Sequence, residues 1–155
     1  MKTHVSGEIR ALPDEVFDYL VEVSNLKTWV TNIADVIPAE DEALSPGVQF
    51  TTVYRYGHAN YQLVQQVTRF EPNRRIAWRT VRGEMPVGFD ITIAERGETS
   101  AIRYEQDAIP DGVVSQASYL LLAPLMKIAV RRRLKFDLAR LTEAIEAGST
   151  IKELS

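Results

Sequence analysis

The chain has 155 residues, of which 45% are apolar and 25% charged, and its 18 basic and 21 acidic side chains give a net charge of −3. This composition predicts one ordered domain over residues 1–155 and excludes intrinsic disorder as its main state. The mild acidity argues against a nucleic-acid binder, which needs a basic face. Cysteine is absent and the only histidines are His4 and His58, so we expect no metal site and no cofactor.

The sequence carries no targeting signal that would place it in a membrane or outside the cell. The first residues lack the apolar segment of a secretory signal. The longest apolar run, 119–126, is far shorter than the ~20 residues that cross a bilayer. We therefore expect a cytoplasmic protein without a transmembrane segment, and we leave open a weak homodimer.

The first third of the chain predicts one strand followed by two short helices. Residues 4–10 alternate as in a strand. Pro13 occupies a favourable first helical position, and the acidic Asp14 and Glu15 suit a helix N-terminus. Ser24 is a candidate cap for the second helix.

From about residue 34 to residue 109 the apolar pattern changes to a period of two, which is typical of strands. Short turns rich in Gly, Pro and Asn separate the segments, so the strands should pair as an antiparallel meander. The predicted strands are 34–40, 48–56, 60–70, 75–82, 88–95 and 100–108.

The alternation divides the strand residues between two faces. One face consists of Phe50, Thr52, Tyr54, Leu63, Gln65, Val67, Trp78, Thr80, Phe89, Ile91, Ile93, Ile102, Tyr104 and Gln106. Every charged residue in the compared strand positions, Asp90 and Glu105 among them, falls on the other face. The pattern therefore predicts a sheet with one buried and one solvated face.

The chain ends in a predicted helix over residues 114–147, closed by Gly148 and kinked at Pro124. Apolar residues recur along it at helical spacing, which predicts a helix that lies across the sheet. These residues are Val130, Leu134, Leu138, Leu141 and Ile145.

The order of these elements resembles the helix-grip arrangement of the START/Bet v 1-like (SRPBCC) superfamily, and within it the polyketide cyclase/dehydrase-like group. The residues that carry the resemblance are Ala11, Pro13, Val16, Phe17, Leu20, Leu26, Trp29, Gly47, Phe50, Val67, Phe70, Pro72, Arg75, Ile76, Trp78, Ser100, Ile102 and Tyr104. The resemblance implies an α+β fold in which a long C-terminal helix covers the concave face of a curved antiparallel sheet. It also implies an internal cavity between sheet and helix, and it transfers no catalytic residue.

The first functional hypothesis is binding of an apolar or aromatic small molecule, lipid-, polyketide- or quinone-like, in that cavity. Polar side chains among apolar ones on the inward face would orient it. The alternative is a filled core whose polar groups are satisfied locally. The candidate ligand-binding residues are Phe50, Tyr54, Leu63, Gln65, Trp78, Thr80, Phe89, Ile91, Ile102, Tyr104, Gln106, Tyr119, Leu122, Met126 and Lys127.

Two further hypotheses remain open. A polyketide cyclase/dehydrase-type enzyme would hold a reactive chain and polarise a carbonyl through Tyr54 or Tyr104, the ionisable strand residues of the inward face. A partner-binding module, similar to the co-chaperone branch of the superfamily, would use an exposed apolar patch, for which Phe136 is the candidate.

Several other residues allow both a functional and a purely structural interpretation. Lys127 shares the predicted buried face of the helix and would pair with an acidic ligand, unless its ammonium reaches solvent. The cluster Arg131-Arg132-Arg133 with Lys135 is either a solvated face or a contact for an anionic lipid surface or acidic partner. The loops at Met85-Pro86 and Asp111-Gly112 are either ordinary turns or the entrance of the cavity.

Overall fold

The computed structural model describes residues 1–38, 42–108 and 116–154, with the side chains of 116–119 and 150–154 excepted. Seven antiparallel strands form one sheet in the order β1-β7-β6-β5-β4-β3-β2. The strands are β1 (Lys2–Ile9), β2 (Ile33–Pro38), β3 (Gln49–Tyr56), β4 (Ala59–Glu71), β5 (Arg75–Arg82), β6 (Val87–Arg96) and β7 (Thr99–Ala108). The predicted meander is therefore confirmed, and β1 joins it beside the last strand.

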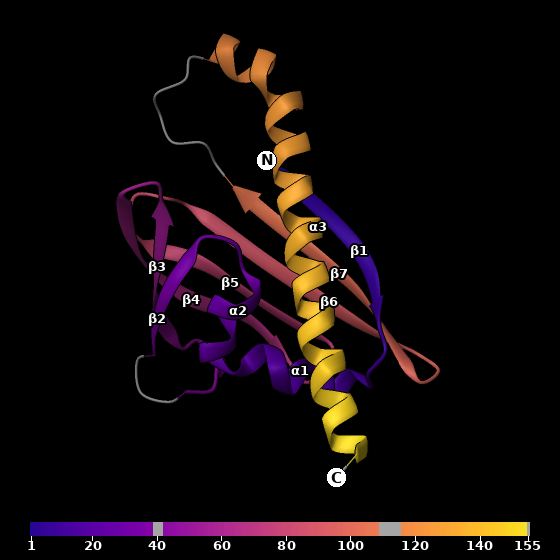
Figure 1. Cartoon of the computed structure of the whole chain (residues 1–155). Helices are drawn as coiled ribbons and strands as arrows, with labels where there is room; N and C mark the ends of the chain where they lie inside the picture. The colour runs from indigo at the N-terminus through magenta and orange to yellow at the C-terminus, as the bar shows by residue number, and fades with distance from the viewer. Residues whose placement is uncertain (39–41, 109–115, 155) are drawn as a thin grey trace.

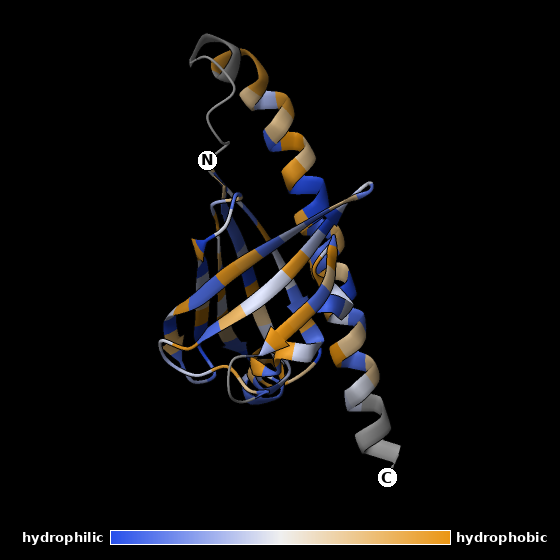
Figure 2. Ribbon diagram, turned by 90° about the vertical axis from the view of Figure 1, so that its left-hand side faces the viewer, coloured by the Kyte–Doolittle hydropathy of each residue, from blue (hydrophilic) through white to orange (hydrophobic). Residues whose placement is uncertain are grey.

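The sheet curves because its strands twist and because β4 is irregular. The pairing of β4 with β5 shifts register between Val67 and Arg69, and such a bulge bends a strand. Figure 2 shows the sheet curling around an interior while the long helix runs along its open side. The inward residues of the predicted alternation, such as Phe50, Ile91 and Tyr104, are buried in this interior.

The short helices α1 (Pro13–Val21) and α2 (Leu26–Trp29), with a 3-10 turn at Val23–Asn25 between them, close one end of the interior. Proline begins α1 as expected. Ser24 does not cap α2, because it lies inside the 3-10 turn and Asn25 occupies the cap position. Leu26 and Trp29 nevertheless face the core, and both are fully buried.

The C-terminal helix α3 (Gln116–Leu154) crosses the concave side of the sheet (Figure 1). Leu134, Leu138, Leu141 and Ile145 are buried on its inner side, as the apolar stripe predicts. The expected end at Gly148 is wrong, because α3 continues past it. Gly148 does not adopt the left-handed conformation of a helix-ending glycine, so it simply costs the helix about 1 kcal/mol relative to alanine.

The first turns of α3 project beyond the end of the sheet (Figure 1). Among the described side chains of this projecting part, five large apolar ones are exposed: Leu120, Leu121, Leu122, Leu125 and Ile128. No helix in the described part of the chain combines the length and apolarity needed to cross a membrane.

Candidate functional site

A pocket of about 260 Å³ lies between the concave face of the sheet and α3. Its walls come from the two residues that follow α2, from β3, from the β5–β6 turn, from β6 and β7, and from α3. The residues that line it are Val30, Thr31, Tyr54, Tyr56, Glu84, Met85, Pro86, Val87, Phe89, Gln106, Ala108, Val130, Arg133 and Asp137. Nine of these fourteen are apolar or aromatic, and the other five are Thr31, Glu84, Gln106, Arg133 and Asp137.

Tyr54 brings a buried phenol to the wall of this pocket. The alternation of β3 turns its side chain inward, where it is 4% exposed and stacks with Tyr56 at 6.3 Å between ring centroids. Its hydroxyl has no hydrogen-bond partner among the described residues. Burial raises the pKa of Tyr54 far above its ordinary value, so the group is a neutral donor at physiological pH.

Asp137 brings a carboxylate to the same pocket from α3, and only 1% of the residue is exposed. Its Oδ1 accepts hydrogen bonds from the backbone N–H of Thr31, at 3.0 Å, and from the Thr31 hydroxyl. Its Oδ2 accepts from the Tyr104 hydroxyl at 3.3 Å. Burial raises the pKa of Asp137 above its ordinary value, and this effect outweighs the hydrogen bonds from Thr31 that lower it.

Arg133 lies one helical turn before Asp137 and donates a hydrogen bond to the side-chain oxygen of Gln106 on β7. Its positive charge acts to lower the pKa of Asp137, although less strongly than burial raises it. Gln106 is 4% exposed, so the amide is held inside by this contact. The pocket therefore contains one cation and one buried carboxyl from the same helix.

The β5–β6 turn supplies the apolar wall opposite α3. The Thr80 hydroxyl donates to the carbonyl of Met85 at 2.9 Å and accepts from the Val87 N–H at 3.3 Å. These bonds fix the turn where Met85 and Pro86 reach the pocket. The loop at Met85-Pro86 therefore does line the cavity, whereas Asp111-Gly112 lies outside the described residues.

Three of the predicted ligand-binding residues line the pocket: Tyr54, Phe89 and Gln106. Seven others are buried in the core without lining it, namely Phe50, Leu63, Gln65, Trp78, Ile91, Ile102 and Tyr104. Gln65 accepts a hydrogen bond from the Thr52 hydroxyl at 3.1 Å, while its side-chain nitrogen has no partner among the described residues. Thr80 does not line the pocket either, and its hydroxyl forms hydrogen bonds within the β5–β6 turn.

The predicted residues of α3 do not meet this pocket. Leu122 and Lys127 are exposed and Met126 is half-buried, because this part of α3 projects beyond the sheet. The side chain of Tyr119 lies outside the described part of the structure. The helix enters the pocket wall only from Val130 onward.

Sequence reasoning missed Asp137, Arg133 and Thr31 as pocket residues. A signal for Asp137 was available, since it follows Leu134 by three positions and precedes Leu141 by four, and so shares their face of the helix. The inward ionisable groups that the sequence predicts are Tyr54, Tyr104 and Lys127, and Asp137 is not among them. No comparable signal marks Thr31, which follows the short helix α2.

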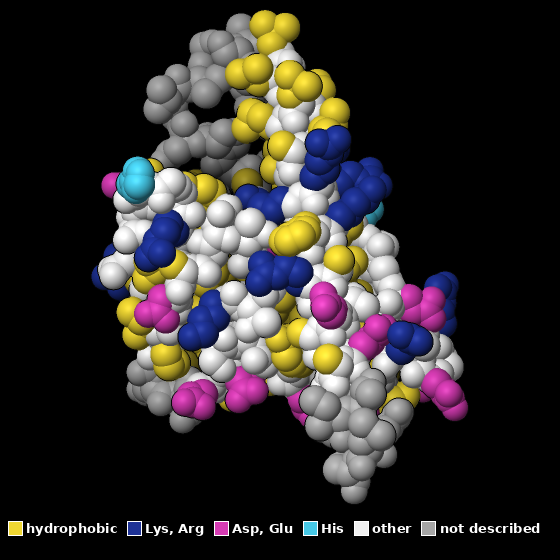
Figure 3. Space-filling view, in the orientation of Figure 1, with side chains coloured by type: hydrophobic (Ala, Val, Ile, Leu, Met, Phe, Trp, Pro, Cys, Tyr) yellow, Lys and Arg dark blue, Asp and Glu magenta, His cyan; other side chains and the backbone are white. Residues whose placement is uncertain are grey.

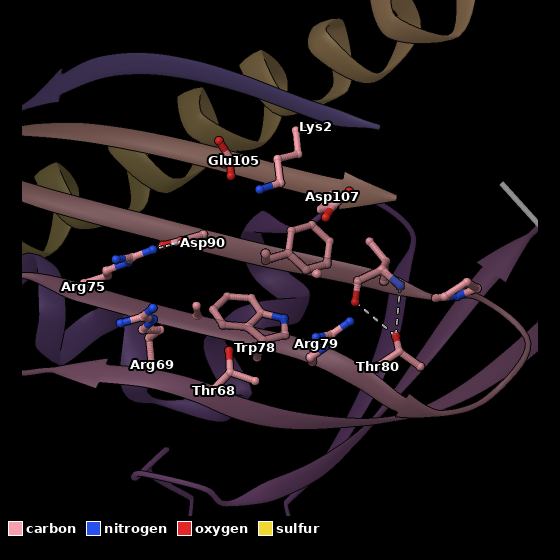
Figure 4. Close-up of a pocket in the computed structure, with 15 residues that line it drawn as sticks. Lys2, Thr68, Arg69, Arg75, Trp78, Arg79, Thr80, Asp90, Glu105 and Asp107 are labelled. Carbon is pink, nitrogen blue, oxygen red and sulfur yellow. Dashed lines mark hydrogen bonds and ion pairs between the residues drawn. The ribbon is translucent and has the colours of Figure 1, made fainter. Parts of the chain in front are cut away.

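A second hollow, of about 250 Å³, lies on the convex face of the sheet (Figure 4). Seven of the fifteen residues that line it are charged, and Arg75 pairs with Asp90 across β5 and β6 at 2.6 Å. Asp107 pairs with the N-terminal amine at 3.3 Å. Because its charges are in part neutralised across strands and the hollow is open to solvent, we favour the concave pocket as the functional site.

No three His, Asp or Glu side chains within the described ranges are grouped as a metal site would require. His4 lies on β1 and His58 in the turn between β3 and β4, so the two are carried by different parts of the sheet.

The sequence model of a family described as polyketide cyclase/dehydrase and lipid transport matches residues 1–146. A search of curated proteins finds no match. The structure is similar to TTHA0849 of Thermus thermophilus, with a TM-score of 0.76 and 12% identity over 96% of this chain and 99% of that chain.

Two further solved structures have similar scores. The ZhuI aromatase/cyclase of Streptomyces sp. R1128 has a TM-score of 0.74 and 12% identity, covering 94% of this chain and 93% of its own. A START superfamily protein of Mycobacterium smegmatis has a TM-score of 0.73 and 13% identity, covering 94% and 97% respectively. At these identities the likeness shows the fold, which is the helix-grip arrangement that the sequence predicts.

Proposed function

We propose a function from one premise: the chain belongs to the polyketide cyclase/dehydrase and lipid transport family. The proposed function is binding of an apolar or aromatic small molecule, with at least one polar group, in the pocket between the sheet and α3. The observation that carries the proposal is the buried Tyr54 hydroxyl, which lines the pocket and has no partner among the described residues.

An unpartnered buried hydroxyl costs about 1–3 kcal/mol of stability, because it has lost its hydrogen bonds to water. A ligand that accepts a hydrogen bond from Tyr54 would recover part of this cost. The apolar wall of Val87, Phe89 and Val130 would meanwhile cover the ligand's hydrocarbon. A hydroxylated or carbonyl-bearing aromatic compound fits both requirements.

Calorimetric titration with 1-naphthol, a bicyclic aromatic alcohol, tests this proposal. Val130→Trp places an indole in the pocket and should weaken binding at least tenfold. Val81→Trp is the matched control, because Val81 is 46% exposed and does not line the pocket. Equal affinity of the two variants, with unchanged melting temperatures, would contradict the proposal.

Tyr54→Phe tests the polar contact separately from the shape of the pocket. The variant keeps the ring and removes the hydroxyl, so 1-naphthol affinity should fall by about threefold to tenfold. Native mass spectrometry of freshly purified protein is the companion measurement. A bound mass that is lost on denaturation would show that a ligand occupies the protein, and analysis of an organic extract would identify its chemical class.

A second candidate function, a cyclase/dehydrase reaction on the bound molecule, is favoured by Asp137. A buried carboxyl with a raised pKa on a pocket wall has the properties of a general base. It would take a proton from the carbon between two carbonyls of a poly-β-keto chain. That carbon would then bond to the carbon of a carbonyl farther along the same chain. As the C=O π bond of that carbonyl opens, its oxygen would receive the proton that Asp137 had taken.

Asp137→Asn separates the two functions. The amide keeps the shape of the carboxyl and cannot act as a base at neutral pH. Catalysis predicts that the variant binds 1-naphthol like the unsubstituted chain and loses ring formation from a poly-β-keto substrate. Ring formation at an equal rate in both proteins would exclude Asp137 as the base.

A further inference from the structure

The projecting end of α3 carries a group of exposed apolar side chains that the pocket does not use. We define the apolar tip as Leu120, Leu121, Leu122, Leu125 and Ile128, whose exposed fractions run from 46% for Leu122 to 79% for Leu121. Figure 3 shows hydrophobic side chains gathered on this end of the molecule, which extends away from the sheet.

The apolar tip covers a wider arc of the helix than a single narrow stripe does. Successive helical residues are rotated by about 100°, so Leu120, Leu121 and Leu122 span about 200° of the circumference, and Leu125 and Ile128 fall within that arc. A groove on a partner protein would cover one side of such a helix, as an amphipathic stripe requires. An environment that covers more than half of the circumference fits this distribution better.

One basic residue lies within the sequence of the apolar tip, and others follow shortly after it. We define the basic turn as Lys127, Arg131 and Arg132, which are all exposed and form no ion pair within the residues that the structure describes. Figure 3 shows Lys and Arg side chains gathered where the projecting helix meets the body of the molecule. With a rise of about 1.5 Å per residue, Arg131 lies roughly 9 Å along the axis from Leu125.

The charge of this region is opposite to that of the chain as a whole. Residues 116–136 contain five basic and no acidic side chains, whereas the chain has a net charge of −3. Two copies that met through their tips would bring like charges together without an acidic partner from the same segment. An anionic surface supplies the missing charge, so charge complementarity favours lipid over a second copy.

From these observations we propose that the apolar tip inserts into the surface of an anionic phospholipid bilayer, with the basic turn at the level of the lipid phosphates. Helices that bind interfaces bury apolar side chains about 5–10 Å deep and keep Lys and Arg at the headgroups. With α3 entering the surface along its axis, the roughly 9 Å between Leu125 and Arg131 is similar to that depth. Lys127 lies between Leu125 and Ile128, and its long side chain reaches back toward the phosphates.

Docking in this way would place the ligand pocket near the bilayer. Val130, the first α3 residue of the pocket wall, comes two residues after Ile128 of the tip. An apolar ligand would therefore pass between pocket and membrane over a short distance. The docking itself does not depend on the proposed function, since the tip and the basic turn contribute no residue to the pocket.

Flotation of the full chain with vesicles tests the proposal. We expect binding to vesicles of phosphatidylcholine with 30 mol% phosphatidylglycerol, roughly tenfold weaker binding to phosphatidylcholine alone, and a loss of several-fold when salt is raised to about 0.5 M. Arg131→Gln with Arg132→Gln should reduce binding to the anionic vesicles and leave the melting temperature unchanged.

Leu121→Glu and Phe136→Glu form a matched pair. Both substitutions place one negative charge at an exposed apolar site of α3, and Phe136 is 58% exposed but outside the tip. The proposal predicts at least tenfold weaker vesicle binding for Leu121→Glu and less than a twofold change for Phe136→Glu. Leu121→Trp should in addition show a blue-shifted emission that brominated acyl chains quench.

Three results would overturn the proposal. The first is absence of the unsubstituted chain from the floated vesicles, and the second is equal vesicle binding by the two glutamate variants. The third is an unsubstituted chain that does not bind vesicles and instead forms a dimer that Leu121→Glu dissociates. The calorimetric titration with 1-naphthol is done without lipid, so failure of the pocket and failure of the docking are separate outcomes.

Discussion

Tyr104 donates its hydroxyl to Oδ2 of Asp137 over 3.3 Å and so connects the last strand of the sheet to the long helix inside the core. Each residue is only 1% exposed. A carboxylate in this environment has lost most of its hydration, which explains why burial is the largest influence on the pKa of Asp137. Ionisation of Asp137 therefore carries a desolvation cost at this contact between sheet and helix.

The stability of the fold should decrease as Asp137 ionises. Because the folded state raises the pKa of this group above 3.8, its contribution to stability is fully present below that pH and is lost as pH rises through the folded-state value. Asp137→Asn lacks this titration. Urea denaturation at pH 4 and pH 7.5 should show the variant gaining stability relative to the unsubstituted chain at the higher pH; a constant difference would contradict this assignment.

The two buried tyrosines should respond differently to the loss of their hydroxyls. Tyr104→Phe leaves a buried carboxyl oxygen without its donor and should lower the free energy of unfolding by about 1–3 kcal/mol. Tyr54→Phe removes a hydroxyl that has no partner among the described residues, so stability should stay the same or rise by about 1 kcal/mol. Chemical denaturation of both variants measures the contrast, and equal losses would refute it.

The buried side of α3 should carry most of its contribution to stability. Leu134 is fully buried, and Leu134→Ala should cost about 2–5 kcal/mol through lost burial and a cavity. Phe136→Ala, two residues away, should change stability by about 0.5 kcal/mol or less, because the ring is mostly exposed. Similar losses of stability for the two variants in thermal or urea unfolding would mean that α3 does not pack against the sheet through Leu134.

Gly83 should tolerate substitution less well than Gly97. Both have positive φ angles, of 133° and 65°, but a Cβ at Gly83 would lie 2.6 Å from Cδ2 of Leu63 and 3.0 Å from the carbonyl oxygen of Gln62. No atom lies within 4 Å of a Cβ at Gly97. Gly97→Ala should cost about 1–2 kcal/mol and Gly83→Ala more. Equal melting temperatures would contradict the crowding at Gly83.

Most of the sheet could be predicted because one face is solvated and the other buried. Under that condition a strand must alternate, and the alternation of residues 48–108 located each strand to within about two residues. The helix end at Gly148 could not be predicted in this way, since a glycine can end a helix or continue it, depending on its backbone conformation.

The site was less accessible to sequence reasoning, and Lys127 shows why. Its helical position does place it on the same side as Leu134, but the sheet does not extend as far as that turn, so the lysine is exposed. Helical periodicity predicts which side of the helix a side chain faces. It does not predict how far along the helix the sheet that packs against it extends. Thr31 and Arg133 meet in the pocket only through tertiary packing, which no local pattern encodes.

The pairing of β1 with β7 has a consequence for how the chain is made. Every residue from Lys2 to Ile9 faces a partner between Ser100 and Asp107, so the first of the seven strands to be synthesised is paired with the last. Contacts this distant in sequence form slowly and only after the intervening strands exist. Until then β1 has no neighbour, and translation that stops before residue 99 would release a sheet with an open edge, which other chains can join.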